Sequence, residues 1–252
     1  MNYKSQRNVL KLKGIKMSNN FNINFDFYSD TPPDKDPDAH SPMLRKYHLL
    51  LWSKTLPNGD FFELVDTKSN AYLYYLSEQG EFYLGSDAIT HSYRDTKRMA
   101  HVTSQIPSDK VNSLFSIGST IGAYIIFPSN RKNNQMTINQ ARGVNPRIWD
   151  RFDLTLECIR LFYENKESPL YSVLQRYLDF FNMFCNFRGY VDFFLLQDLV
   201  SSDYSSIKYH LQHNDFKEPP LPQSINEYLE YREKTISFVK ARGKRMFKAM
   251  ST

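Results

Sequence analysis

The sequence predicts an α+β fold: one domain with an antiparallel sheet in its N-terminal half, covered by helices from its C-terminal half. Up to about residue 140, short apolar and aromatic runs alternate with turn residues, whereas from Asn145 onward apolar residues recur every three or four positions. Strands followed by helices favour α+β over a wound parallel sheet. We therefore expect a single domain over residues 21–252, ending in a basic helix and preceded by a basic extension, residues 1–20.

The strands are predicted from runs that flank turn signals. Residues 28–42 are rich in proline and aspartate and should form a loop. YHLLLWSK and DFFELVD flank an Asn58-Gly59 turn, and AYLYYLSEQGEFYLGSD turns at Glu78-Gln79-Gly80, so four antiparallel strands are expected between 47 and 87. IGAYIIFP should be a further strand, with MTINQ as its antiparallel return.

The helices are predicted from cap signals and apolar stripes. Short helices are expected near 91–101 and from Ser108. Asn145-Pro146 and Ser168-Pro169 each place an N-cap before a first-turn proline, which predicts helices over 146–164 and 169–187, the second ended by Gly189. YVDFFLLQDLV fits either a buried strand or a short helix, and a Ser224/Glu227 capping box opens a helix over 225–248.

The positive charge lies at the two ends of the chain. Residues 1–20 carry five bases and residues 234–252 carry six, neither with an acid, so the middle has 21 bases against all 27 acids, a net charge of −6. Basic ends predict contacts with RNA or DNA, or with an acidic protein partner such as an antitoxin. Met17 is a second candidate start, which would make the first basic segment an optional extension.

Cysteine use and apolar run lengths predict the compartment. Cys158 and Cys185 lie in apolar stretches and are expected to be small buried hydrophobes, which fits a reducing compartment. Lys11 and Lys13 interrupt the N-terminal apolar residues before they reach the length of a signal peptide, and no run approaches the roughly 18 residues of a membrane span. A cytoplasmic protein without a transmembrane segment is therefore expected.

Three stretches resemble one family of bacterial hypothetical proteins. They are KDPDAHSPMLRKYHLLLWSKTLPNGDFF, then TIGAYIIFP with TINQARG, and DRFDLTLECIRLFY continuing to FRGYVDFFLLQDLV, and together they cover roughly residues 34–200. The family is a domain of unknown function. The resemblance implies a bacterial, cytoplasmic, single-domain protein, and it assigns no catalytic residue.

The predicted helix over 146–164 offers a carboxylate pair. Asp153 and Glu157 lie one turn apart opposite the apolar stripe, with Arg151 close by, and are the catalytic candidates because paired carboxylates can hold a cation or divide acid and base roles. The simpler interpretation is a solvated helix face. TINQARG places Asn139 and Arg142 before a helix start, where an anion is favoured, although a turn that caps the next helix explains them equally well.

The other candidates are isolated side chains. His48 and Lys54 bracket a predicted strand, and His48 is a third catalytic candidate, although a strand histidine is more often structural. Lys244 and Arg245 on the last helix are predicted to contact phosphate, or simply to complement the helix dipole.

Several motifs are incomplete. No histidine has the spacing of a zinc site, and D-x-D-x-D at 34–38 lacks the glycine and the glutamate of a calcium loop. Ser86-Asp87 follows a strand without a nucleophile elbow, so Asp87 is expected to cap a helix.

These features support two hypotheses and specify no cofactor. The first is a bacterial effector that acts on nucleic acid or nucleotides, for example the toxin of a toxin-antitoxin or phage-defence locus. It would be either a metal-assisted nuclease using Asp153 and Glu157 or an ADP-ribosyltransferase-like enzyme taking NAD. The alternative is a non-catalytic module that binds nucleic acid or protein through its basic ends.

Overall fold

The computed structural model describes residues 21–67, 71–131 and 134–251. The strands form one antiparallel sheet in the order β1 (Val65–Asp66), β2 (Leu73–Ser77), β3 (Gly80–Ala88), β4 (Tyr124–Pro128). The helices and 3-10 turns before β4 are η1 (Phe27–Asp30), α2 (Pro37–His40), α3 (Pro42–Trp52), η2 (Lys97–Met99), α4 (Ala100–Thr103), α5 (Ser108–Gly118) and η3 (Ile121–Ala123). Those after it are α6 (Ile138–Val144), α7 (Phe152–Tyr163), α8 (Tyr171–Gln175), α9 (Leu178–Asn182), α10 (Phe187–Phe193), η4 (Gln197–Leu199) and α11 (Ile225–Ser251).

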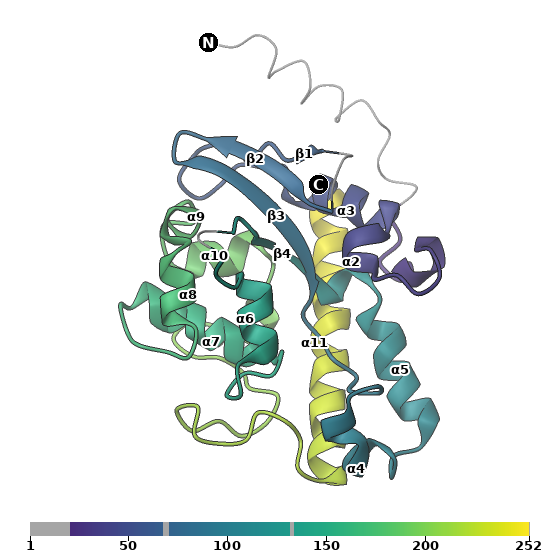
Figure 1. The fold of residues 1–252 in the computed structure, drawn as a ribbon. Coiled ribbons are helices and arrows are strands. Elements are labelled where there is room, and N and C mark those ends of the chain that lie inside the picture. Colours follow the sequence, from purple (N-terminus) through teal and green to yellow (C-terminus); the bar gives the residue numbers. More distant parts are fainter. Residues whose placement is uncertain (1–20, 68–70, 132–133, 252) are drawn as a thin grey trace.

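The predicted α+β class is confirmed, with helices packed around a single antiparallel sheet. Figure 1 shows α6 to α10 gathered on one side of the long helix α11, with α2, α3 and α5 on the other. The expected basic extension, residues 1–20, lies outside the described residues. Within the described ranges, no helix combines the length and apolarity that a bilayer span requires.

Strand β3 is longer than its hairpin partner, and this difference positions the site described below. Residues 80–84 of β3 pair with β2, whereas residues 84–88 pair with the fully buried strand β4. Beyond Leu84, therefore, one edge of β3 has no strand beside it, and α2 contacts β3. Asp87 lies in this part of the strand.

The expectation of a strand over 47–54 is wrong, because residues 47–52 belong to helix α3 and residues 53–54 follow its end. The Ser41 hydroxyl accepts a hydrogen bond from the Leu44 N–H at 3.0 Å, and Pro42 occupies the first helical position. The run LLLW is apolar at every position, so its hydrophobicity shows no helical period. The Asn58-Gly59 turn forms, but only an isolated Thr55–Phe61 bridge and the short strand β1 flank it.

The return strand expected from MTINQ is also wrong, because Thr137 begins helix α6. The Thr137 hydroxyl accepts from the Gln140 N–H, and the Gln140 side chain accepts from the Thr137 N–H at 3.1 Å, which is a capping box. Residues 145–151 then form turns, so α7 begins at Phe152 rather than at 146. Asn145 caps a turn through the Arg147 N–H instead.

The later helices match the expectation in part. The helix expected over 169–187 is divided into α8 and α9, and Gly189 lies inside α10, which resolves YVDFFLLQDLV as helical at its start. The helices from Ser108 and from residue 225 are confirmed as α5 and α11. Cys158 is buried as expected, whereas Cys185 is exposed.

Helix α11 is held to the sheet by a fully buried arginine. The Arg242 guanidinium donates to the Gly122 and Tyr124 carbonyls at 2.9 and 2.8 Å, and to the Phe194 carbonyl at 3.1 Å. Gly122 allows the close approach, because a Cβ there would lie 2.2 Å from the Val239 carbonyl oxygen. Arg242 thus joins η3, β4 and the segment after α10.

Arg242→Met should lower the free energy of unfolding by about 3 kcal/mol or more, because three buried carbonyls would lose their donors. Urea unfolding followed by circular dichroism measures this loss. Lys244→Met, which removes an exposed charge from the same helix, is the matched control and should leave the midpoint unchanged. Equal midpoints for both variants would show that the buried guanidinium does not hold the helix.

Candidate functional site

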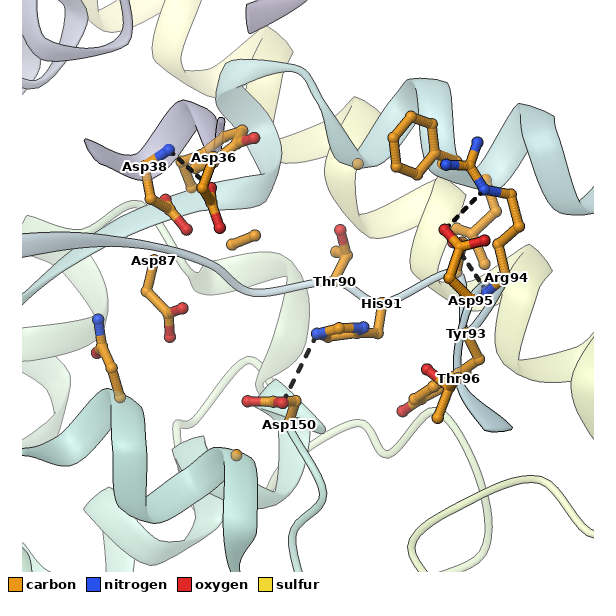
Figure 2. Close-up of a pocket in the computed structure, with 18 of the residues that line it drawn as sticks. Asp36, Asp38, Asp87, Thr90, His91, Tyr93, Arg94, Asp95, Thr96 and Asp150 are labelled. Carbon is orange, nitrogen blue, oxygen red and sulfur yellow. Dashed lines mark hydrogen bonds and ion pairs between the residues drawn. The ribbon is translucent and has the colours of Figure 1, made fainter. Parts of the chain in front are cut away.

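A cavity of about 640 Å³ opens beside the unpaired edge of β3. Five carboxylates line it: Asp36 and Asp38 from the cap of α2 and α2 itself, Asp87 from β3, Asp95, which is paired with Arg94 of the same lining, and Asp150 from the turn before α7. Figure 2 shows Asp36 and Asp38 directed toward Asp87, with Asp150 and His91 facing each other beyond it. We call this space the acidic cavity.

Asp38 is held in the cavity without a cation. The Asp36 side chain caps α2 by accepting from the Asp38 N–H at 3.0 Å, which fixes the backbone of this short helix. Burial raises the pKa of Asp38 well above its usual value, and the neighbouring carboxylates of Asp87 and Asp36 add to the rise. The Asp38 carboxyl group therefore binds its proton more tightly than an ordinary aspartate does.

Asp87, by contrast, is paired with a buried arginine. Arg142 comes from α6, is fully buried, and donates to the Asp87 carboxylate, to the Asp150 carbonyl at 2.8 Å and to the Thr155 hydroxyl at 3.2 Å. Burial raises the pKa of Asp87 to about 6, although the Arg142 guanidinium opposes the rise. The expectation that Asp87 caps a helix is wrong, because β3 continues through it to Ala88.

His91 and Asp150 form the third pair of the cavity. Their Nε2 and Oδ2 atoms are 3.6 Å apart. Burial lowers the pKa of His91 although the Asp150 carboxylate opposes this change, so the imidazole is neutral near pH 7. Gly143 makes room for Asp150, since a Cβ at that position would come within 3.2 Å of its carboxylate.

Four buried polar atoms of the cavity lining have no hydrogen-bond partner among the described residues: Asp38 Oδ1, the Thr90 hydroxyl, the Tyr93 hydroxyl and Asn139 Oδ1. Two of them, the Thr90 hydroxyl and the Asn139 oxygen, belong to side chains that do not ionise. The Asn139 amide nitrogen donates to the Ser86 carbonyl at 3.2 Å, which orients the group. Buried polar atoms normally have partners, so these two are available to a ligand.

Of the residues predicted from sequence, Asn139 lines the acidic cavity and Arg142 lies beneath it. The other seven do not line it: Asp153, Glu157, His48, Arg151, Lys54, Lys244 and Arg245. The structure therefore brings together only Asn139 and Arg142 of the predicted set, and adds five carboxylates and His91 that were not among the candidates. The loop DPD and the Ser86-Asp87 pair were the available signals, but neither matches a motif.

Asp153 and Glu157 do not lie on a solvated face. Their exposed fractions are 0% and 6%, because the 209–221 segment also covers α7. Asp153 accepts from Arg151 at 2.6 and 3.2 Å and from the His210 N–H at 2.8 Å. Glu157 accepts from Arg160 at 2.7 and 2.8 Å. Both carboxylates are thus engaged by arginines of the same region.

His48 is buried in the core, and Lys54 is half-buried. The Trp52 indole N–H donates to His48 Nδ1 at 3.0 Å, and His48 Nε2 lies 2.9 Å from the Ser86 hydroxyl. Burial lowers the pKa of His48 to about 3, so it stays neutral. Lys54 donates to the Phe193 carbonyl at 2.7 Å, and burial lowers its pKa to about 8.

The two C-terminal candidates differ in their surroundings. Arg245 donates to the Asp198 carboxylate at 2.9 and 3.1 Å, whereas Lys244 is exposed. Only Lys244 of this pair is therefore presented freely to a partner.

The chain belongs to a family of unknown function (DUF6994), whose sequence profile matches residues 21–246. This confirms the resemblance to a domain of unknown function and extends it to nearly all of the described chain. No curated protein and no solved structure showed a significant match.

Asp153→Asn should lower the free energy of unfolding by about 3 to 5 kcal/mol, because it leaves Arg151 charged and buried without its partner. Burial alone would raise the pKa of Asp153, but the charge of Arg151 lowers this pKa in the folded chain. The ion pair therefore stabilises the fold above the usual aspartate pKa, and this contribution is lost as the pH falls below about 4.

Denaturant unfolding measured from pH 7 down to pH 3 tests this structural role. The wild type should lose stability more steeply with acid than Asp153→Asn, and Asp179→Asn, an exposed aspartate on α9, should behave like the wild type. An Asp153→Asn variant that is as stable as the wild type would contradict it.

Proposed function

We propose that the acidic cavity is the active site of a bacterial cytoplasmic enzyme that breaks or transfers the glycosidic bond of a nucleotide by acid-base catalysis. The observation that carries the proposal is the unlike surroundings of two neighbouring carboxyl groups. Asp87 is bonded to the Arg142 guanidinium, whereas Asp38 forms no ion pair with any cation that the structure describes. Environments that separate the pKa values of two carboxyl groups assign one as acid and the other as base.

The proposed step uses these groups in turn. The bond between the anomeric carbon of the sugar and the base nitrogen breaks, its electron pair leaves with the base, and Asp38 donates its proton to that nitrogen. A water or acceptor hydroxyl adds to the anomeric carbon, and Asp87 accepts the proton it releases. Between these two events, positive charge develops on the sugar. The carboxylates of Asp87 and Asp150 stabilise this charge.

The size and lining of the cavity fit a nucleoside-sized ligand. Its volume of about 640 Å³ falls within the usual range for small-molecule sites. The rings of Tyr28, Phe115 and Tyr124 line it, and aromatic faces stack on bases. The unpartnered Thr90 hydroxyl and Asn139 oxygen can bond to sugar hydroxyls or base edges.

Between the two enzyme classes expected from the sequence, the cavity favours glycosyl transfer over a metal-assisted nuclease. The nuclease was built on Asp153 and Glu157, whose carboxylates are bonded to Arg151 and Arg160. In the described part of the chain, no three His, Cys, Asp or Glu side chains are grouped so as to hold a metal ion. The proposed step therefore relies on the chain's own side chains.

Consumption of nucleotides, or modification of nucleic acid, would make the enzyme an effector of the toxin or phage-defence kind. This role is proposed from the chemistry alone. Expression in a bacterial host tests it, because the wild type should slow growth and Asp38→Asn should not. Equal growth of the two strains would contradict the effector role. The catalytic proposal is tested separately by the enzyme assay.

The binding module is a second candidate because α11 ends in an exposed basic face. Lys240, Lys244 and Lys248 are exposed and follow one another at four-residue spacing, beside Phe247, which is 48% exposed. If this face binds RNA, replacing all three lysines with methionine should flatten the dependence of log affinity on log salt. Unchanged affinity and salt dependence in this variant would contradict the idea.

Asp38→Asn and Asp87→Asn should each reduce turnover by about 100-fold or more, because each removes one proton-transfer group. Release of free base, followed by chromatography over a panel of NAD, nucleosides and nucleotides, measures the rate. The wild-type rate should fall as the pH drops below about 6, where Asp87 takes up a proton. It should fall again at high pH as Asp38 loses its proton.

Asp34→Asn is the matched control for these variants. Asp34 is an exposed aspartate just before α2, and its positive φ of 60° suits asparagine. It should keep the wild-type rate. Full activity of Asp38→Asn and Asp87→Asn on a panel substrate that the wild type cleaves would contradict the assignment.

A further inference from the structure

A smaller chamber of about 320 Å³ continues from the acidic cavity. The two spaces share part of their lining: His91, Tyr93, Thr96, Gly143 and Asp150. Figure 2 shows Tyr93 and Thr96 on the opposite side of the His91–Asp150 pair from Asp38 and Asp87. A ligand that passes this pair can therefore occupy both spaces. We call the smaller one the side chamber.

The side chamber differs from the acidic cavity in charge. Lys97 and Arg98 line it, both are exposed, and neither forms an ion pair with any residue that the structure describes. The Arg98 guanidinium carbon lies over the Trp149 ring, 3.7 Å from its centre, in a cation–π contact. Stacking leaves the N–H edges of the guanidinium free to bond to an anion.

The backbone around the side chamber adopts conformations that L-residues rarely take. Tyr93, Trp149 and Asp150 have φ angles of 57°, 41° and 61°, and all three line the chamber. Residues held in the left-handed region are strained and gather at ligand sites, where rigid placement is useful. The strained turn thus presets both the Trp149 platform under Arg98 and the Asp150 carboxylate at the junction.

We propose that the side chamber binds the phosphate of the nucleotide whose glycosidic bond lies in the acidic cavity. The inference rests on the proposed function and narrows its substrate from nucleosides in general to phosphorylated ones. An anionic group is repelled by the ionised carboxylates of the acidic cavity and attracted by Lys97 and Arg98, so the charges orient the ligand. The sugar then lies between Asp38, Asp87 and the His91–Asp150 pair.

Binding is measured by calorimetry on the full chain carrying Asp38→Asn, which prevents turnover. The probes are a nucleoside, its 5′-monophosphate and 5′-diphosphate, and inorganic pyrophosphate. The phosphorylated forms should bind at least roughly 10-fold more tightly than the nucleoside, because their phosphates accept charge-assisted hydrogen bonds from Lys97 and Arg98. A Lys97→Met/Arg98→Met double variant should lose this preference while still binding the nucleoside, and pyrophosphate should compete only with the phosphorylated forms.

Arg131→Met is the matched control. Arg131 is an exposed cation in a separate hollow of about 230 Å³ that shares Asp38, Asn139 and Gln140 with the acidic cavity. It should keep the preference for phosphate. Three results would overturn the inference: equal affinity for nucleoside and nucleotide, loss of the preference in Arg131→Met instead of the double variant, or no binding of any phosphorylated probe. A retained phosphate preference with no turnover of any substrate would overturn the enzymatic proposal alone.

Discussion

The buried Arg142 guanidinium is the interaction on which the candidate site depends. It carries a positive charge with no exposed surface and bonds to Asp87 on β3, to the turn at Asp150 and to Thr155 on α7. The carboxylates of Asp87 and Asp150, which both lie beside Arg142, could not both be ionised in a buried setting without such a cation. The same contacts bring α6, β3 and the start of α7 together, so the charge balance of the cavity and the local fold have one origin.

The unpaired part of β3 explains why a cavity forms here at all. Strand β2 ends opposite Leu84, and the edge beyond it faces α2 rather than another strand. Helix α2 brings Asp38 to this edge, where burial raises the pKa of its carboxyl group. Across the cavity, the strained turn of Trp149 and Asp150 is held by Arg142 and accommodated by Gly143. Sheet topology thus places unlike carboxyl groups side by side.

Local signals predicted much of the fold and little of the site. The hairpin of β2 and β3, strand β4, and helices α5 and α11 follow from turns, runs and caps in the sequence. The errors at α3 and α6 arose where a Ser41-Pro42 cap and a Thr137/Gln140 capping box were outweighed by apolar runs. Arg142 and Asn139 were selected because they were expected to precede a helix start, but both lie within α6. Asp38, Asp87 and His91 were not, because their proximity depends on contacts between distant segments that no local pattern reveals.

The central claim is that two neighbouring carboxyl groups differ in protonation at neutral pH. Carbon-13 NMR titration of the aspartate carboxyl resonances, assigned with Asp38→Asn and Asp87→Asn, tests it directly. The account predicts that Asp87 titrates with a pKa of about 6 and that Asp38 stays protonated through neutral pH. Two carboxyl groups that both titrate near the ordinary aspartate pKa of about 4 would contradict it.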